Sequence, residues 1–104
     1  MGTKAVIRVK GFSEKVIGMT SDGHISNLKV ICARFHSKAK ELQVLTAFKK
    51  GMARETRLVM EAIAKEFDLF LCGPHEPQFV SYSAEVDPKT GLSTYYNGHF
   101  EEEA

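Results

Sequence analysis

The chain has 104 residues, of which 43% are hydrophobic and 26% are charged, and its net charge at neutral pH is +1. This length and composition are those of one ordinary globular domain, whose core needs neither a disulfide nor a metal. No apolar run approaches the ~20 residues of a membrane-spanning helix, and the N-terminus lacks the basic-then-apolar pattern of a signal peptide. We therefore expect a cytoplasmic protein with no membrane contact.

Two short runs rich in β-branched residues begin the chain. Residues 5–10 and 15–20 each have the pattern of a strand, and residues 11–14 have the composition of a short turn. The pair is therefore predicted to form a hairpin. Residues 21–24 then turn the chain, and Gly23 is the residue that would allow a positive φ there.

The middle of the chain has helical periodicity in two segments. In residues 26–41 one apolar stripe is formed, and extended at its end, by Leu28, Ile31, Cys32, Phe35, Ala39 and Leu42. In residues 53–67 one face is shared by Met52, Thr56, Val59, Met60, Ile63 and Phe67. Between them, residues 42–50 alternate like a strand, but they also fit a short helix or a continuation of the first helix. We favour helix or irregular structure for this segment.

The last third of the chain reads as strands. Residues 68–72 predict a short apolar strand, and residues 78–86 and 92–97 predict a hairpin closed by the turn at residues 87–91. The acidic tail, residues 101–104, is expected to be disordered. The element order ββααβββ predicts an α+β fold, a two-layer sandwich in which two helices cover one face of an antiparallel sheet.

The opening strand and the turn before the first helix carry a resemblance. The run Thr-Lys-Ala-Val-Ile-Arg-Val from Thr3 to Val9, the pair Asp22-Gly23 and the late tyrosine-rich hairpin resemble a set of small phage and prokaryotic proteins. Members of that set have a longer His-Trp-Asp-Gly-Tyr-Pro motif before the first helix, whereas this chain keeps only Asp22-Gly23 and has no tryptophan. The resemblance covers about the first third of the chain. It implies a fold layout and a mobile-element context, and it supplies no catalytic residue.

Groups capable of chemistry occur mainly in predicted turns and strand ends, where functional residues tend to gather. A metal site assembled in space would use Asp22, His24, His75 and His99. Cys72 and His75 are close enough in sequence to suggest a thiol nucleophile with its base. No two histidines have the i, i+4 spacing of a helical metal site, and Cys32 lies forty residues from Cys72. We therefore assign no catalytic residue and no cofactor, and expect both cysteines to be buried reduced thiols.

The charges divide along the chain. Residues 1–65 hold 13 lysines and arginines against 5 acids, a balance of +8, and residues 66–104 hold one lysine against 8 acids, a balance of −7. If the basic residues of the helices converge, they would bind a phosphate backbone through Lys29, Arg34, Lys38, Lys40, Lys49, Lys50, Arg54 and Arg57. The other interpretation is a solvated surface whose basic and acidic parts attract each other, within one chain or between subunits.

The last hairpin contains three tyrosines, Tyr82, Tyr95 and Tyr96. Because side chains alternate along a strand, Tyr95 and Tyr96 are predicted to point to opposite faces, so that one is exposed. Exposed aromatic residues are typical of protein interfaces, and these three are candidate contacts for a protein partner or a second subunit. The sequence therefore favours a small non-enzymatic interaction protein, of phage or mobile-element origin, that binds a protein partner or itself. A nucleic-acid-binding protein and a small metal- or thiol-dependent enzyme are the alternatives.

Overall fold

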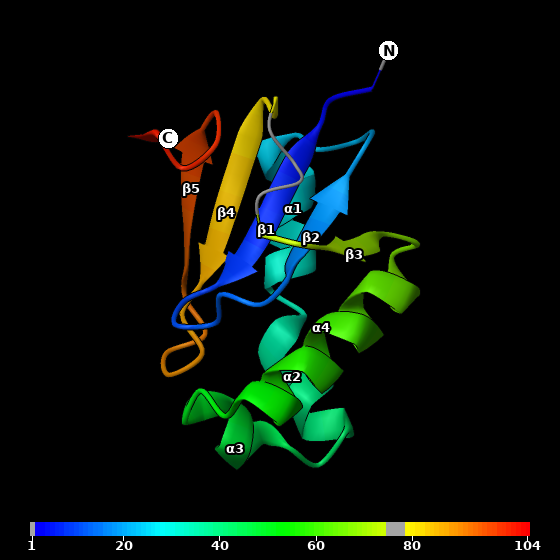
Figure 1. Ribbon diagram of the computed structural model, residues 1–104, viewed down its shortest axis with the longest axis vertical. Helices are drawn as coiled ribbons and strands as arrows, with labels where there is room; N and C mark the ends of the chain where they lie inside the picture. The colour runs from blue at the N-terminus through cyan, green and yellow to red at the C-terminus, as the bar shows by residue number, and fades with distance from the viewer. Residues whose placement is uncertain (1, 75–78) are drawn as a thin grey trace.

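In the residues that the structure describes, a sheet of six strands forms one layer, and four helices form the rest (Figure 1). The computed structural model describes residues 2–74 and 79–104. In chain order the elements are β1 (Ala5–Val9), β2 (Val16–Met19), α1 (Ile25–Cys32), α2 (Phe35–Glu41), α3 (Leu45–Lys49), α4 (Ala53–Glu66), β3 (Phe70–Cys72), β4 (Tyr82–Val86), β5 (Ser93–Asn97) and β6 (Glu102–Glu103). The strands lie in the order β3-β2-β1-β4-β5-β6. The predicted α+β class and both predicted hairpins are confirmed.

The sheet is mixed, which corrects the antiparallel arrangement expected from the sequence. β1 and β4 run parallel, whereas every other neighbouring pair is antiparallel. β3 pairs with the edge of β2 that faces away from β1. β4, the first strand of the last hairpin, pairs with the other edge of β1. The chain enters β4 from the end where β1 begins, and the Ser81 N–H donates to the Lys4 carbonyl there (2.9 Å). A parallel pair needs a long connection, and β2, the helices and β3 together provide it.

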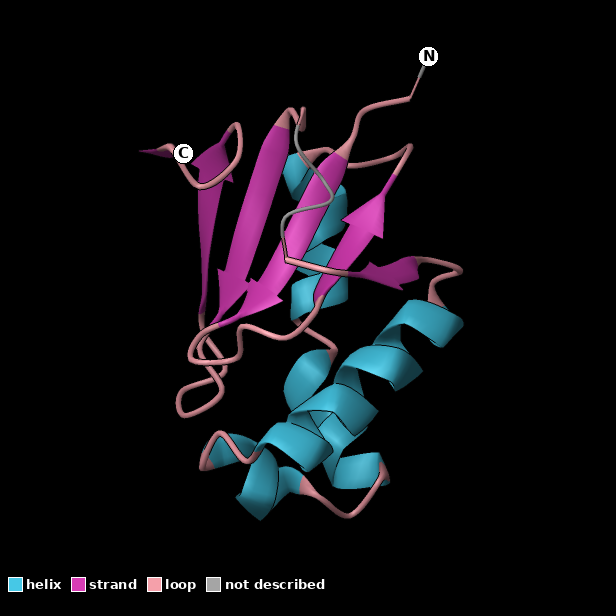
Figure 2. Cartoon of the chain, in the orientation of Figure 1, coloured by secondary structure: helices cyan, strands magenta, loops and turns pink. Residues whose placement is uncertain are grey.

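α1 and α4 make the main contacts between helices and sheet. α1 lies against β4 and β5, and α4 lies against β2 and β3, whereas α2 and α3 pack against α4 (Figure 2). The sheet face toward the helices carries the fully buried side chains of Ile7, Ile17 and Ala84. This face and the helices enclose the main core. Among the residues that the structure describes, none of the helices is both long and apolar enough to span a bilayer.

The first predicted helix is divided in two, which differs from the expectation. α1 ends at Cys32, and the Arg34 N–H bonds to the Ile31 carbonyl, only three residues earlier (3.0 Å). This tighter turn redirects the chain, so that α1 follows the sheet while α2 turns toward α4. The segment contains neither glycine nor proline, so tertiary packing decides where the helix bends.

The segment at residues 42–50 is helical or irregular, as favoured from its sequence. Gln43 has a φ of +60°, which prevents α2 from continuing past this residue. α3 follows, and its Phe48 is fully buried. The predicted apolar stripes of the helices are otherwise buried from Leu28 to Ala39 and from Thr56 to Ile63. Leu42 and Met52 are exceptions, with exposed fractions of 41% and 51%, because the chain leaves the helical path beside each of them.

In the turn before α1, the positive φ expected at Gly23 occurs at the preceding residue, Asp22. The positive φ belongs to Asp22 (59°), and Gly23 has an ordinary φ. Gly23 is buried against the opening strand, and its N–H donates to the Thr3 carbonyl (2.9 Å). A side chain at this position would meet backbone atoms of Thr3 and Ala5. Glycine is therefore required for close approach and not for a left-handed conformation.

The acidic tail, expected to be disordered, contributes a short strand. Glu102 and Glu103 form β6, which pairs with Asn97 and Tyr96 of β5. The Ala104 N–H donates to the Tyr95 carbonyl (2.7 Å). Backbone hydrogen bonding to the free edge of β5 thus orders residues whose composition alone suggested a frayed end.

Candidate functional site

Part of the predicted basic face is neutralised by carboxylates between α2 and α4. The terminal nitrogens of Arg34 lie 2.7 Å from carboxylate oxygens of Glu66 and Glu41, and Lys38 Nζ lies 2.6 Å from Glu66. The hydrogen bonds that Arg34 donates to Glu66 raise the pKa of Arg34 above its usual range. The same contact, with a smaller one from Lys38, lowers the pKa of Glu66 to about 2. Arg34 and Lys38 therefore link α2 to α4 through ion pairs with Glu66, and their charges are already compensated.

Of three further residues of the predicted set, Arg54 and Arg57 lie one turn apart on α4, whereas Lys29 lies on α1. Arg57 pairs with Glu14 at 2.5 Å. Lys29 extends from α1 toward β5, and its Nζ lies 5.7 Å from the centre of the Tyr95 ring. Arg54 is exposed in the first turn of α4. These side chains do not form one surface.

Four lysines from three segments do converge. Lys49 and Lys50 end α3, Lys10 follows β1, and Lys89 lies in the turn between β4 and β5. All four line a cavity of about 340 Å³. Among the described residues that line it, Asp87 is the one acid, and its Oδ1 accepts the Lys89 backbone N–H (2.9 Å). Its carboxylate is thus used within its own turn.

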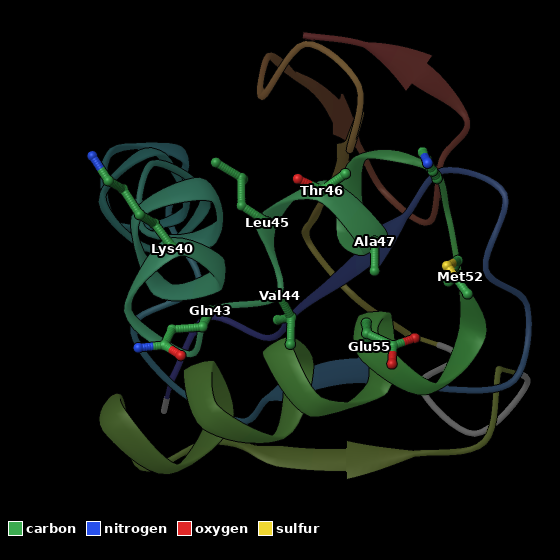
Figure 3. Close-up of a pocket in the computed structure, with 9 residues that line it drawn as sticks. Lys40, Gln43, Val44, Leu45, Thr46, Ala47, Met52 and Glu55 are labelled. Atoms are coloured by element: carbon green, nitrogen blue, oxygen red, sulfur yellow. The ribbon is translucent and has the colours of Figure 1, made fainter.

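A second cavity, of about 570 Å³, lies between the end of α2, α3 and the start of α4 (Figure 3). Lys40 stands on one wall, Met52 lies on the opposite side, and Glu55 projects from α4. Lys50 lines this cavity and the first one. The two cavities therefore adjoin at Lys50, and lysines line both of them.

We call this region the lysine surface and define it as Lys10, Lys40, Lys49, Lys50 and Lys89. All five are exposed, and within the described part of the chain none of them forms an ion pair. Lys40, Lys49 and Lys50 belong to the basic set predicted from the sequence, whereas Lys10 and Lys89 do not. The parallel pairing of β1 with β4 brings these two together, because Val9 pairs with Val86 and Lys10 N–H donates to the Val86 carbonyl. Lys10 and Lys89 each follow one strand of this parallel pair. Their proximity could have been predicted from the sequence only if the parallel direction of the two strands had been recognised.

The three tyrosines proposed as partner contacts are divided between the two faces of the sheet. Tyr82 and Tyr95 pack against the main core on the helix side. Tyr96 is on the other face, where its ring meets that of Phe100 edge-on at 5.5 Å. The predicted opposition of Tyr95 and Tyr96 is confirmed, but both are half-buried, so the expectation that one of them is exposed was wrong. The three side chains do not form one patch.

The residues considered for a metal site are also separated. His24 precedes α1, with its Nε2 3.3 Å from Thr3 Oγ1 and its ring centre 5.9 Å from that of Tyr82, on the helix side. His99 contacts the Phe100 ring on the other face. His75 lies outside the described residues. Within residues 2–74 and 79–104, no group of three or more His, Cys, Asp or Glu side chains has a metal-binding arrangement.

Both cysteines are buried and reduced, as predicted. Burial raises the pKa of Cys32 to about 12, and hydrogen bonds with Ser93 and Tyr95 offset only part of this effect. Because the thiolate is the nucleophile, Cys32 is inert at neutral pH. Cys72 is a core residue on the other face of the sheet, where its Sγ donates to the Val16 carbonyl (3.8 Å).

No protein-family model matches the chain, and neither the curated proteins nor the solved structures contain a match. The lysine surface is the feature in which the largest number of unpaired like charges converge.

Proposed function

We propose that the protein binds nucleic acid through the lysine surface. The observation that carries this proposal is the convergence of Lys10, Lys49, Lys50 and Lys89, from three separate segments, around one cavity. Like charges held together repel one another unless an anion compensates them. The net charge of the chain is only +1, yet the lysines of the lysine surface lie close together. Such a concentration of positive charge is suited to binding a polyanion.

The chemistry of these side chains favours contacts with phosphates over reading of bases. Lysine is a flexible point charge without the planar fork that arginine offers to guanine. Contacts of this kind position a protein on the backbone and carry no sequence information. We therefore expect binding without sequence preference, with a dissociation constant of about 1–100 µM at physiological salt. Such an activity fits a cytoplasmic protein of a phage or mobile element, the context that the resemblance implies.

The test compares two double variants that remove the same charge. Lys50→Gln/Lys89→Gln alters the lysine surface, whereas Lys4→Gln/Lys65→Gln alters exposed lysines that line neither cavity. Binding of a fluorescent DNA duplex and a single-stranded RNA is measured by anisotropy at low salt. The first variant is expected to bind about tenfold or more weakly, since each lost phosphate contact removes close to one power of salt dependence. The second variant is expected to bind like the original protein.

Equal weakening by both variants would show that only net charge matters, and the proposal would be wrong. Absence of binding to either probe at low salt would also reject it. Circular dichroism of each variant verifies the fold, and exposed lysines are positions where glutamine is well tolerated.

Association with a protein partner or a second copy is the other candidate, and Phe70 favours it. This side chain lies on β3, the outermost strand on its side of the sheet, and is 45% exposed. Its ring lies over Gly18, where an added β-carbon would be 2.4 Å from the ring. An exposed aromatic residue on an edge strand is a typical contact for another chain.

Light scattering over a range of concentrations tests this candidate. If Phe70 mediates association, the original protein is larger than one chain and Phe70→Ser is monomeric. The matched control is Leu92→Ser, which removes another exposed apolar side chain (73%) from the turn between β4 and β5. A monomeric original protein would reject self-association.

A further inference from the structure

A cavity of about 440 Å³ lies on the sheet face opposite the helices, toward the turn between β1 and β2. Its polar lining comes from Arg8 on β1, Glu85 on β4 and His99 after β5, and Phe12 and Val16 contribute apolar walls. The volume falls within the range of small-molecule sites, which combine apolar walls with a few placed polar groups.

Arg8 is held in one orientation at this cavity. Arg8 and Glu85 are register partners on adjacent strands, and Arg8 Nε donates to Glu85 Oε2 (2.8 Å). The guanidinium carbon lies 3.7 Å from the centre of the Phe100 ring, a cation–π contact. Within the described residues, the hydrogen bond through Nε is the one that Arg8 makes. An arginine held through Nε keeps its two terminal nitrogens available, and these bind a carboxylate in bidentate fashion.

Phe100 adopts a strained conformation to make this contact. Its φ is +60°, which is unfavourable for a residue with a bulky side chain. Two hydrogen bonds stabilise it: the Phe100 N–H donates to Ser83 Oγ (2.7 Å), and Ser83 Oγ donates to the Gly98 carbonyl (2.8 Å). Ser83 is fully buried. Backbone strain that persists because its surroundings fix it is typical of functional sites.

The charge of the site selects the ligand. Glu85 balances the charge of Arg8, so the site has no surplus positive charge to hold a dianion, and a carboxylate monoanion that pairs with the terminal nitrogens of Arg8 is the better match. We propose that this cavity binds a small organic acid, with its carboxylate on the terminal nitrogens of Arg8 and its apolar part against Phe12 and Val16. His99 stands at the same cavity as a further hydrogen-bond donor. No residue of the lysine surface lines this site, although Gly11 lines both this cavity and the neighbouring cavity of about 340 Å³.

The test is a titration followed by two-dimensional ¹H–¹⁵N NMR of the full chain. The probes are benzoate, phenylacetate and hexanoate, with inorganic phosphate as the comparison anion, each up to about 20 mM so that millimolar dissociation constants are covered. At least one carboxylate is expected to give saturable shifts at the amides of Arg8, Ser13 and Phe100, and phosphate is expected to bind these residues several-fold more weakly.

Variants separate binding from charge and from folding. Arg8→Gln should abolish the saturable shifts, and Ser83→Ala, which keeps Arg8 but releases Phe100, should weaken binding about tenfold. Arg54→Gln, which removes an exposed arginine elsewhere, should leave binding unchanged. Saturation by none of the carboxylates, saturation that survives Arg8→Gln, or equal binding of phosphate would overturn the proposal. The spectrum of each variant reports its fold, and if Arg8→Gln is unfolded, Ser83→Ala decides.

Discussion

A β-carbon placed on Gly23 would lie 2.6 Å from the β-carbon of Ala5. The Asp22-Gly23 turn and the opening strand are therefore in direct contact, and the Gly23 N–H bonds to the Thr3 carbonyl. These are two of the three stretches from which the resemblance to small phage and prokaryotic proteins was inferred. The contact gives a physical reason for a glycine to accompany that strand.

Gly23→Ala is predicted to destabilise the protein by about 1–3 kcal/mol, the usual cost of overpacking. The atoms that the new methyl group meets include the Thr3 carbonyl oxygen and the Ala5 nitrogen, and backbone atoms yield less than side chains. Urea unfolding measures the change. Asp22→Gly is the control, because it relieves a positive φ and should alter stability by less than about 0.5 kcal/mol. If the alanine variant were equally neutral, the tight packing of this turn would be disproved.

Phe35→Ala is predicted to cost about 3–5 kcal/mol. Phe35 is fully buried in the main core, and its ring stacks on that of Phe48 with centroids 6.4 Å apart. Leu42→Ala, at the exposed end of the same predicted stripe, should cost less than about 1 kcal/mol. A loss below about 1 kcal/mol for Phe35→Ala in urea unfolding would mean that the helical face is assigned wrongly.

The contribution of Glu66 to stability is predicted to depend on pH. Its pKa is about 2 in the folded protein and 4.5 without its partners. Because the folded value is the lower one, the stabilisation is complete above about pH 4.5 and is lost as pH falls toward 2. Both partners are partly exposed, so the effect is modest and weakens with salt.

Urea midpoints of the original protein and of Glu66→Gln measure this effect. The difference between them is expected at pH 7 and should shrink at pH 3. Glu61→Gln, another exposed carboxylate on α4, is the control and should show no such convergence. A difference that stays constant with pH would show that Arg34 and Lys38 do not stabilise the fold through this carboxylate.

Local patterns in the sequence were enough for the elements of the fold and for most of the core. The alternation of Val6 and Ile7 and the stripe from Leu28 to Ala39 depend only on which side chains must avoid water. The direction of β4 and the bend at Arg34 depend on contacts between distant segments, and no local pattern records them. The strand of the acidic tail is another such case, since Glu102 is ordered by the edge of β5 and not by its own propensity.

The basic character of the first part of the chain was likewise visible in its sequence, but its grouping was not. Arg34 and Lys38 meet Glu66 across two helices, and Arg57 meets Glu14 on the first hairpin. Those distant acids remove three charges from the predicted set. The parallel strand pair adds Lys10 and Lys89 to it.

The most direct test of the lysine surface is the dependence of DNA affinity on salt. Five phosphate contacts predict a slope of about −4 to −5 when the logarithm of the binding constant is plotted against that of salt concentration. Lys50→Gln/Lys89→Gln should reduce the magnitude of this slope by about 2, whereas Lys4→Gln/Lys65→Gln should leave it unchanged. The same slope for all three proteins would contradict the assignment of nucleic-acid binding to the lysine surface.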